Sequence, residues 1–166
     1  EAAAYVETLR KNLLYLNVSD VKMEEGSMRC DVNISLSKDK DTLGTKTEIK
    51  NLNSIANVQK AVQAEIERQS ALLDAGEKVE QATRRYDEAQ KTTILMRKKE
   101  GNVDYKYFPE PNIFPIQLDL DWVKSIQDNL EELPDARLAR FMKDYELSEY
   151  DASVLVSDRE MADFFE

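Results

Sequence analysis

Residues 28 to 37 alternate between apolar and polar side chains with a period of two. The apolar positions are Met28, Cys30, Val32, Ile34 and Leu36, and the polar positions between them are Arg29, Asp31, Asn33, Ser35 and Ser37. A period of two over this length predicts a half-buried strand with one face in a core. The other face carries Arg29, Asp31 and Asn33 in one row. This row fits either a cross-strand ion pair on a solvated face, the commoner arrangement, or a face that grips a polar ligand.

A helix and two further strands are predicted around this strand. Residues 2 to 16 have apolar side chains at helical spacing, and residues 21 to 23 read as a short strand. Gly26 lies in the turn that follows, where it can take a positive φ. We therefore expect a hairpin between residues 21–23 and 28–37. Residues 45 to 50 alternate again and predict a third strand.

A long helix is predicted directly after Asn51-Leu52-Asn53-Ser54. Asn53 or Ser54 is a natural N-cap, because its side-chain oxygen can accept from a free first-turn amide. Gly76 is expected to end the helix. The predicted buried stripe consists of Ile55, Val58, Val62, Ile66, Gln69 and Leu73. The junction also presents backbone N–H groups suited to an anion, so ordinary capping and anion binding both remain open.

Residues 79–86 and 92–97 predict two more strands joined by a turn. Beyond them, residues 104–111 combine aromatic and charged side chains with Pro109 and Pro111, which impose an extended backbone. This segment fits either an aromatic lid over a polar site or a strand that closes the core.

The remaining elements, after Pro115, are predicted to be helices. One covers residues 121–130, another begins at Pro134, and Ser148 and Ser157 are expected to cap two more. The predicted fold class is α+β: an antiparallel sheet with packed helices, followed by an all-α part. We expect the α+β domain at residues 1–118, a linker with a short helix at 119–132, and an incomplete helical domain at 133–166.

Composition narrows the possible functions. The 166 residues carry a net charge of −10, which argues against broad, non-specific binding to a nucleic-acid backbone. Local basic patches exist at residues 84–85 and 97–99. The sequence contains no histidine, which excludes Ser–His triads, histidine zinc sites and an imidazole base within it.

Cys30 is the single cysteine, so it forms no disulfide within the chain, and we expect a cytoplasmic protein. No apolar run approaches the roughly 20 residues of a membrane span. The first residues do not resemble a signal peptide and read as the interior of a longer chain.

Six motifs taken together resemble one family. They are MEEGSMRCDVNIS (23–35), GTKTEIKNLNS (44–54), ERQ (67–69), QATRRYD (81–87), MRKKE (96–100) and DYKYFPEP (104–111). In this order they resemble GatB, the B subunit of the aspartyl/glutamyl-tRNA amidotransferases. The first part of the chain is similar to the C-terminal half of the cradle domain of GatB, and the part after about residue 130 to the start of its helical domain.

The resemblance implies an ATP-dependent, glutamine-hydrolysing carbon–nitrogen ligase. Such an enzyme amidates mischarged Glu-tRNA(Gln) or Asp-tRNA(Asn), and which of the two is preferred stays open. GatB uses ATP and Mg²⁺ to activate the side-chain carboxylate. Ammonia that the amidase subunit releases from glutamine then displaces the phosphate. The implied partners are the amidase (A) and C subunits of a heterotrimer and the mischarged tRNA, without a membrane.

The resemblance supports a set of site positions, and chemistry suggests their roles. Arg29 and Lys50 suit phosphate oxygens, and Asp31 suits a magnesium ion or the orientation of Arg29. We class these three as catalytic. The expected cofactor- or substrate-binding residues are Asn33, Asn51, Asn53 and Arg84. The first three suit phosphate or ribose, and Arg84 suits the activated carboxylate or the tRNA end.

No metal ligand set is assigned within the chain, because the family's metal-binding histidine and glutamates precede the part that this sequence resembles. We therefore expect the 166 residues to be inactive on their own. The alternative is a non-catalytic module that docks partner subunits or the tRNA acceptor stem.

Overall fold

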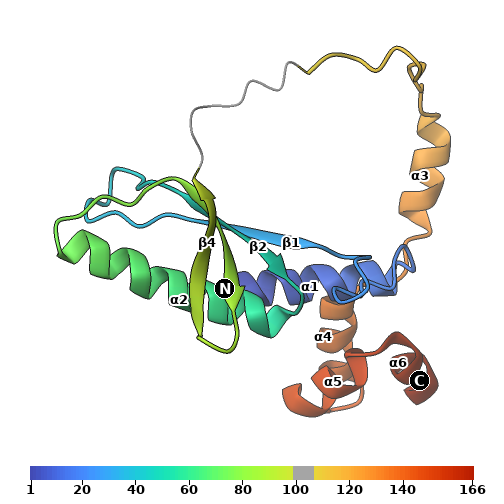
Figure 1. Ribbon diagram of the computed structural model, residues 1–166. Coiled ribbons are helices and arrows are strands. Elements are labelled where there is room, and N and C mark those ends of the chain that lie inside the picture. The colour runs from blue at the N-terminus through green and yellow to red at the C-terminus, as the bar shows by residue number, and fades with distance from the viewer. Residues whose placement is uncertain (99–106) are drawn as a thin grey trace. The chain divides into compact units, whose positions relative to one another are not determined.

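The computed structural model describes residues 1–98 and 107–166. The chain divides into two compact units, which are treated separately below (Figure 1). Among the described residues, the first unit contains 1–13 and 19–98, and the second contains 14–18 and 107–166.

The first unit is a four-stranded sheet with a long helix along one face (Figure 1). Its elements are α1 (Ala2–Tyr15, ending in the second unit), β1 (Cys30–Ile34), β2 (Thr47–Leu52), α2 (Ile55–Asp74), β3 (Ala82–Asp87) and β4 (Thr92–Lys98). The strands follow the order β1-β2-β3-β4. The predicted strands at 79–86 and 92–97 are thus confirmed as β3 and β4, and the third strand lies slightly later than predicted.

The sheet is not wholly antiparallel, contrary to the prediction from the sequence. β1–β2 and β3–β4 are antiparallel pairs, but β2 and β3 run parallel. The reason is the connection: α2 carries the chain back along the sheet, so β3 starts at the same end as β2. The mixed α+β class is confirmed.

The predicted hairpin between residues 21–23 and 28–37 is wrong. The Ser27 amide and the Met28 amide both donate to the Lys22 carbonyl oxygen, at 3.1 and 3.4 Å, which closes a short loop rather than a strand ladder. Val21 enters this loop with a φ of 43°, outside the strand region. β1 therefore pairs with β2 and covers only Cys30–Ile34.

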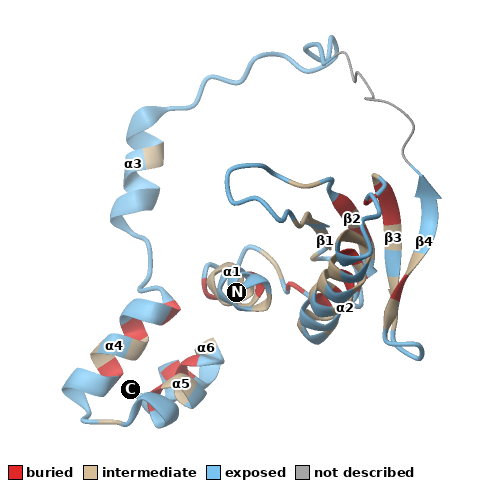
Figure 2. Ribbon diagram, turned by 90° about the vertical axis from the view of Figure 1, so that its left-hand side faces the viewer, coloured by how far each residue is buried: buried red, intermediate tan, exposed pale blue. Residues whose placement is uncertain are grey.

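The core of the first unit lies between the sheet and α2 (Figure 2). Its buried members are Met23, Ile49, Leu52, Val58 and Ala61. The apolar side chains of β1 pack against this cluster at intermediate burial, while its polar side chains are exposed. The alternation predicted for this strand is confirmed.

Both predicted ends of α2 are confirmed. The Asn57 amide donates to the Ser54 hydroxyl at 3.1 Å, which caps the first turn. Gly76 takes a φ of 77°, and the Glu77 amide reaches the Leu72 carbonyl at 2.9 Å, as in a Schellman motif. The predicted stripe is only partly right, because the fully buried line consists of Val58, Ala61, Glu65 and Gln69.

The second unit is helical. It contains α3 (Leu120–Asp128), α4 (Pro134–Asp144), α5 (Glu149–Val156) and α6 (Arg159–Phe165). Phe141 is its fully buried centre and packs with Tyr15, Ala152, Val156 and Ala162.

The helix starts at Pro134 and after Ser148 are confirmed, but the predicted Ser157 cap is wrong. The Met161 amide donates to Asp158 Oδ1 at 2.9 Å, so Asp158 caps α6. Ser157 instead follows the last turn of α5 and donates its hydroxyl to the Val154 carbonyl.

The predicted aromatic segment falls partly on residues 104–106, which lie outside the described residues. Residues 107–111 form no strand, and Tyr107 and Phe108 are exposed.

α3 is confirmed, although its apolar residues Trp122 and Ile126 are exposed. No helix in the described part of the chain combines the length and apolar character needed to span a bilayer.

Candidate functional site

A bulge in the β1–β2 pair shapes the surface that the sequence singled out. Cys30 faces Leu52 and Val32 faces Ile49, so Asp31 alone opposes two residues, Lys50 and Asn51. Asn51 takes a φ of 61°, a left-handed conformation that asparagine tolerates better than most residues. The extra residue turns the strand and leaves Asn51 exposed beside Asp31.

The bulge brings Lys50 and Asp31 together. Lys50 Nζ lies 2.8 Å from Asp31 Oδ2 and 3.3 Å from Glu48 Oε1. The two hydrogen bonds that Lys50 donates, first to Asp31 and then to Glu48, raise its pKa above the usual value. The ammonium is therefore held in its charged form between two carboxylates on the exposed face of the sheet.

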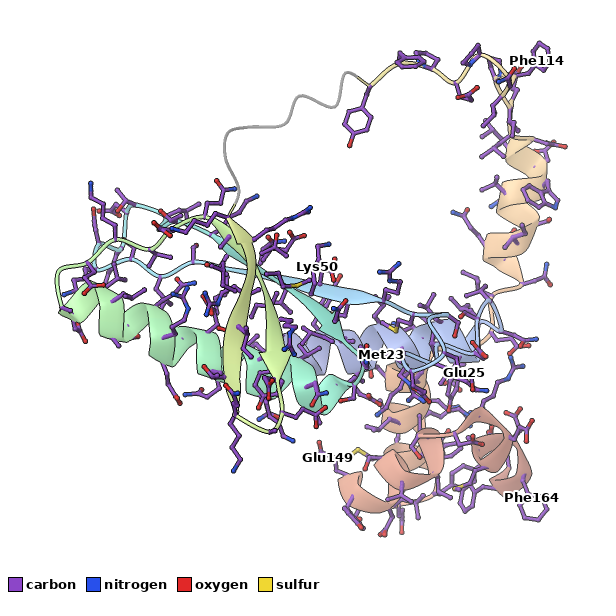
Figure 3. The ribbon with its side chains drawn as sticks, viewed as in Figure 1. Met23, Glu25, Lys50, Phe114, Glu149 and Phe164 are labelled. Carbon is purple, nitrogen blue, oxygen red and sulfur yellow. The ribbon has the colours of Figure 1, made fainter. Side chains whose placement is uncertain are left out.

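A short loop forms the wall beside the bulge, and Figure 3 shows its Met23 and Glu25. Met23 is buried in the core of the first unit, and Lys22 Nζ pairs with Glu25 Oε1 at 3.0 Å. Gly26 turns the loop with a φ of 83°. The buried methionine anchors the loop, and the exposed acidic residues stay at the surface.

The loop and the bulge enclose a hollow of about 260 Å³. It is lined by Met23, Glu24, Glu25, Gly26, Met28, Arg29, Cys30, Asp31, Asn51, Leu52 and Asn53. Cys30 is not a suitable nucleophile there, because burial and the charge of Asp31 raise the pKa of its thiol. The hollow therefore offers one guanidinium, carboxylates and two amides to a polar ligand.

Four of the seven predicted site residues line this hollow: Arg29, Asp31, Asn51 and Asn53. Lys50 joins them through its ion pair with Asp31. Asn33 lies further along β1, exposed and opposite Glu48, and does not line the hollow.

Arg84 is separated from the other predicted residues. It is in register with the buried Ile49, so its side chain lies on the α2 face of the sheet, while Lys50 lies on the other face. Arg84 Nε donates to Thr93 Oγ1 at 2.9 Å, and a terminal nitrogen donates to the Thr93 carbonyl at 2.6 Å. The structure thus brings together five of the seven residues and leaves Asn33 and Arg84 apart.

Comparison with known protein families shows which family the chain belongs to. Residues 1–124 match the model of the GatB/GatE catalytic domain. The chain belongs to this family. The match covers all of the first unit and the hollow with its lining residues.

Relatives of the GatB family extend the similarity to the whole chain. Proteins named as the B subunit of aspartyl/glutamyl-tRNA(Asn/Gln) amidotransferase are 51% identical in Moorella thermoacetica, 53% in Bacillus licheniformis and 50% in Streptococcus pneumoniae. Each alignment covers 100% of this chain and 35% of the relative. The chain therefore spans about a third of the length of these relatives.

Three acidic residues near the site were missed by reasoning from the sequence. Glu24 and Glu25 precede Gly26 in the predicted turn, yet they line the hollow. Glu48 contacts Lys50 and accepts from the Thr83 hydroxyl at 3.2 Å. The sequence contained a signal for Glu48. It lies between Lys46 and Lys50 on the polar face of the third predicted strand, where a carboxylate flanked by two ammonium groups indicates an ion pair.

The side chains that line the hollow could supply only some of the ligands of a phosphate-bound Mg²⁺ ion. Carboxylate oxygens such as those of Asp31 suit Mg²⁺, which commonly takes one or two carboxylates together with substrate phosphates. Within residues 1–98 and 107–166 no group of three or more metal-ligating side chains occurs. A metal at this site would thus need ligands beyond those that this part of the chain supplies.

Proposed function

We propose that the hollow between the loop 22–27 and the β1–β2 bulge forms part of the carboxylate-activating site of a tRNA-dependent amidotransferase. The substrates are mischarged Glu-tRNA(Gln) or Asp-tRNA(Asn), and ATP supplies the phosphoryl group that activates the side-chain carboxylate. Ammonia from glutamine then displaces the phosphate. The observation that carries this proposal is the Asp31–Lys50 pair beside Arg29, inside a GatB/GatE catalytic domain.

The chain's own residues suit the positioning and charge neutralisation that phosphoryl transfer requires. Arg29 would bind phosphate oxygens with its planar fork of donors. Lys50 would add a second positive charge, held in place by Asp31. Asn51 and Asn53 would donate side-chain amides to phosphate or ribose from the end of β2.

Asp31 is the residue that would hold Mg²⁺ or orient Arg29, and Lys50 would stay beside it through its second contact, with Glu48. Mg²⁺ would supply neutralisation of charge on the transferred group. Asn33 and Arg84 lie outside the hollow, and their roles in the proposal are less direct. Asn33 suits a ribose or phosphate contact at the outer end of β1, and Arg84 would act only from the opposite face of the sheet.

The proposal also includes the partners and the location that the family resemblance implies. The amidase (A) subunit would supply ammonia, the C subunit would complete a heterotrimer, and the assembly would be cytoplasmic. A cradle domain would end near residue 118 and a helical domain would begin near residue 133.

The competing function is a docking module without chemistry. It is favoured by the large apolar side chains that stay exposed between residues 107 and 130, including Phe108, Phe114 and Trp122. Such side chains commonly mark surfaces that other proteins cover. The two functions make different predictions for Arg29, Asp31 and Lys50.

The test replaces these three residues singly in the full-length protein, in complex with its partner subunits, as Arg29→Ala, Asp31→Asn and Lys50→Met. The activation site predicts that assembly and glutaminase activity persist while ATP-dependent amidation falls by about 100-fold or more. Arg10→Ala, on α1, serves as a matched control for loss of a guanidinium outside the hollow. Intact amidation with weakened assembly would establish the docking module instead.

A further inference from the structure

Two buried polar side chains of α2 lie beneath the sheet. Glu65 and Gln69 are one turn apart on α2, and each is 0% exposed. These positions belong to the innermost line of the helix, where apolar residues are usual. Burying a carboxylate and an amide is costly unless every polar atom is bonded, so their contacts indicate what they do.

Gln69 binds the backbone at the end of β1. Its Oε1 accepts from the Leu36 amide at 3.0 Å, and its Nε2 donates to the Ile34 carbonyl at 3.3 Å. A carbonyl and an amide two residues apart are the pair that one residue of a neighbouring parallel strand would engage with its own N–H and C=O. Gln69 thus takes the place of a strand partner just where the β1–β2 ladder ends.

Glu65 fixes the orientation of Gln69. Gln69 Nε2 donates to Glu65 Oε1 at 2.8 Å, which leaves Gln69 Oε1 to accept from β1. Burial alone would raise the pKa of Glu65, but hydrogen bonds from Arg68, Thr93 and Gln69 lower it. The carboxylate is therefore ionised and acts only as an acceptor.

The other contacts of Glu65 anchor it to the helix and to the far side of the sheet. Arg68 binds both carboxylate oxygens, at 3.0 and 2.6 Å, and Thr93 on β4 donates to Oε2 at 2.6 Å. Arg84 on β3 lies 3.6 Å from Oε2. A continuous polar connection thus runs from β4 and β3 through α2 to the end of β1.

β1 needs such an anchor. Among residues 1–98 and 107–166 it has one strand neighbour, β2, and its ladder is interrupted by the bulge at Asp31. A five-residue strand with a bulge and a single neighbour is held by few backbone hydrogen bonds. The place of Asp31 relative to Lys50 depends on how firmly β1 is held at both ends.

We propose that Gln69, oriented by Glu65, is a positioning residue that fixes strand β1 and thereby the Asp31–Lys50 pair of the activation site. This inference rests on the proposed function of that site. It also gives Arg84 a role that fits its location, as part of the polar anchor rather than as a group that touches substrate.

The experiment uses the full-length protein in complex with its partner subunits and compares Gln69→Met with Gln63→Met. Gln63 is exposed on the same helix, so the second variant matches the first in chemistry without touching β1. In Gln69→Met, we expect hydrogen exchange at the Leu36 amide to quicken about tenfold, because its side-chain acceptor is lost. The kcat of ATP-dependent amidation should fall about tenfold while the KM for aminoacyl-tRNA changes less than about twofold.

The control variant should match the wild type in both measurements. Faster exchange at Leu36 with an unchanged kcat would overturn the positioning role. So would equal loosening of all core amides, because the variant would then report general destabilisation. If Gln69→Met does not assemble, Gln69→Asn takes the same test, since it keeps the amide but is one methylene too short to reach β1.

Asp31→Asn, assayed in parallel, separates this inference from the proposed function. If Asp31→Asn abolishes amidation and Gln69→Met does not reduce it, the positioning inference fails alone. If Asp31→Asn amidates normally, the activation site itself is wrong.

Discussion

Lys50 Nζ reaches Asp31 Oδ2 at 2.8 Å across a bulge in which one residue of β1 faces two of β2. The pair lies on the exposed face of the sheet, with side-chain exposures of 33% for Lys50 and 41% for Asp31. Ion pairs as open as this one contribute little to folding. The pair is therefore available for binding chemistry at small structural cost.

The first prediction is that breaking this pair hardly changes stability. Asp31→Asn and Lys50→Met should each alter the free energy of unfolding by less than about 1 kcal/mol, because solvent screens both charges. The raised pKa of Lys50 means that its contribution is fully present below the unfolded-state pKa, about 10.4, and is lost only as the pH rises through the folded-state value. Titration of Lys50 should therefore cause no change of stability with pH near neutral pH.

Urea denaturation of the two variants at several pH values measures this. A loss of more than about 2 kcal/mol would show that the pair is structural, and would remove the basis for interpreting their activities as effects on chemistry.

Local patterns in the sequence were sufficient for several elements. The alternation from Met28 to Leu36 correctly predicted which side chains of β1 face the core. The Ser54 cap and the Gly76 end of α2 were predictable because capping depends on residue types within one turn.

Features that depend on tertiary contacts were not predictable in this way. The left-handed Asn51 and the bulge exist because of how β1 and β2 pair, which no local period encodes. The segment 21–23 imitates a strand because Val21 and Met23 are buried on either side of the exposed Lys22. Glu65 is absent from the predicted buried stripe of α2, because its partners Thr93 and Arg84 are remote in sequence.

The second prediction concerns a buried hydroxyl on β2. Thr47 is 0% exposed, and within the described residues its Oγ1 has no hydrogen-bond partner. Thr47→Val replaces the hydroxyl with a methyl group of similar size and removes an unsatisfied polar atom. We expect an increase in the free energy of unfolding of about 1 kcal/mol.

Thermal or urea unfolding of the chain measures the effect, with Thr45→Val as the control, because Thr45 is exposed and precedes the strand. A decrease in stability for Thr47→Val would mean that the hydroxyl is satisfied in solution and that this account of Thr47 is wrong.

The third prediction concerns Gly44, which passes against the backbone of Leu36. A Cβ at Gly44 would overlap the Leu36 carbonyl oxygen, and backbone cannot move aside as a flexible side chain can. Gly44→Ala should therefore destabilise the first unit by about 1–3 kcal/mol. It should also loosen the end of β1, because Leu36 is the residue whose amide Gln69 binds.

Gly26→Ala provides a contrast. A Cβ there meets nothing within 4 Å, but the φ of 83° is unfavourable for alanine, so a cost of about 1 kcal/mol without effect on Leu36 is expected. Hydrogen exchange at Leu36 distinguishes the two variants. Equal exchange in both would contradict the steric argument.

The fourth prediction is a pH dependence in the helical unit. Tyr15 is buried beside Phe141, and its hydroxyl donates to the Val156 carbonyl at 2.9 Å. Burial raises the pKa of Tyr15 above its ordinary value of 10.0, although the charge of Arg137 opposes the shift. Because the folded-state pKa is the higher one, this stabilisation is complete below about pH 10 and is lost as the pH rises through the folded-state value.

Tyr15→Phe keeps the ring and removes the titrating group. It should cost about 1 kcal/mol at neutral pH through the lost hydrogen bond, and it should flatten the alkaline decline in stability. Tyr150→Phe is the matched control, since Tyr150 is 76% exposed. Unfolding followed by circular dichroism from neutral to strongly alkaline pH measures both effects, and an alkaline decline that is identical in wild type and Tyr15→Phe would assign that decline to other groups.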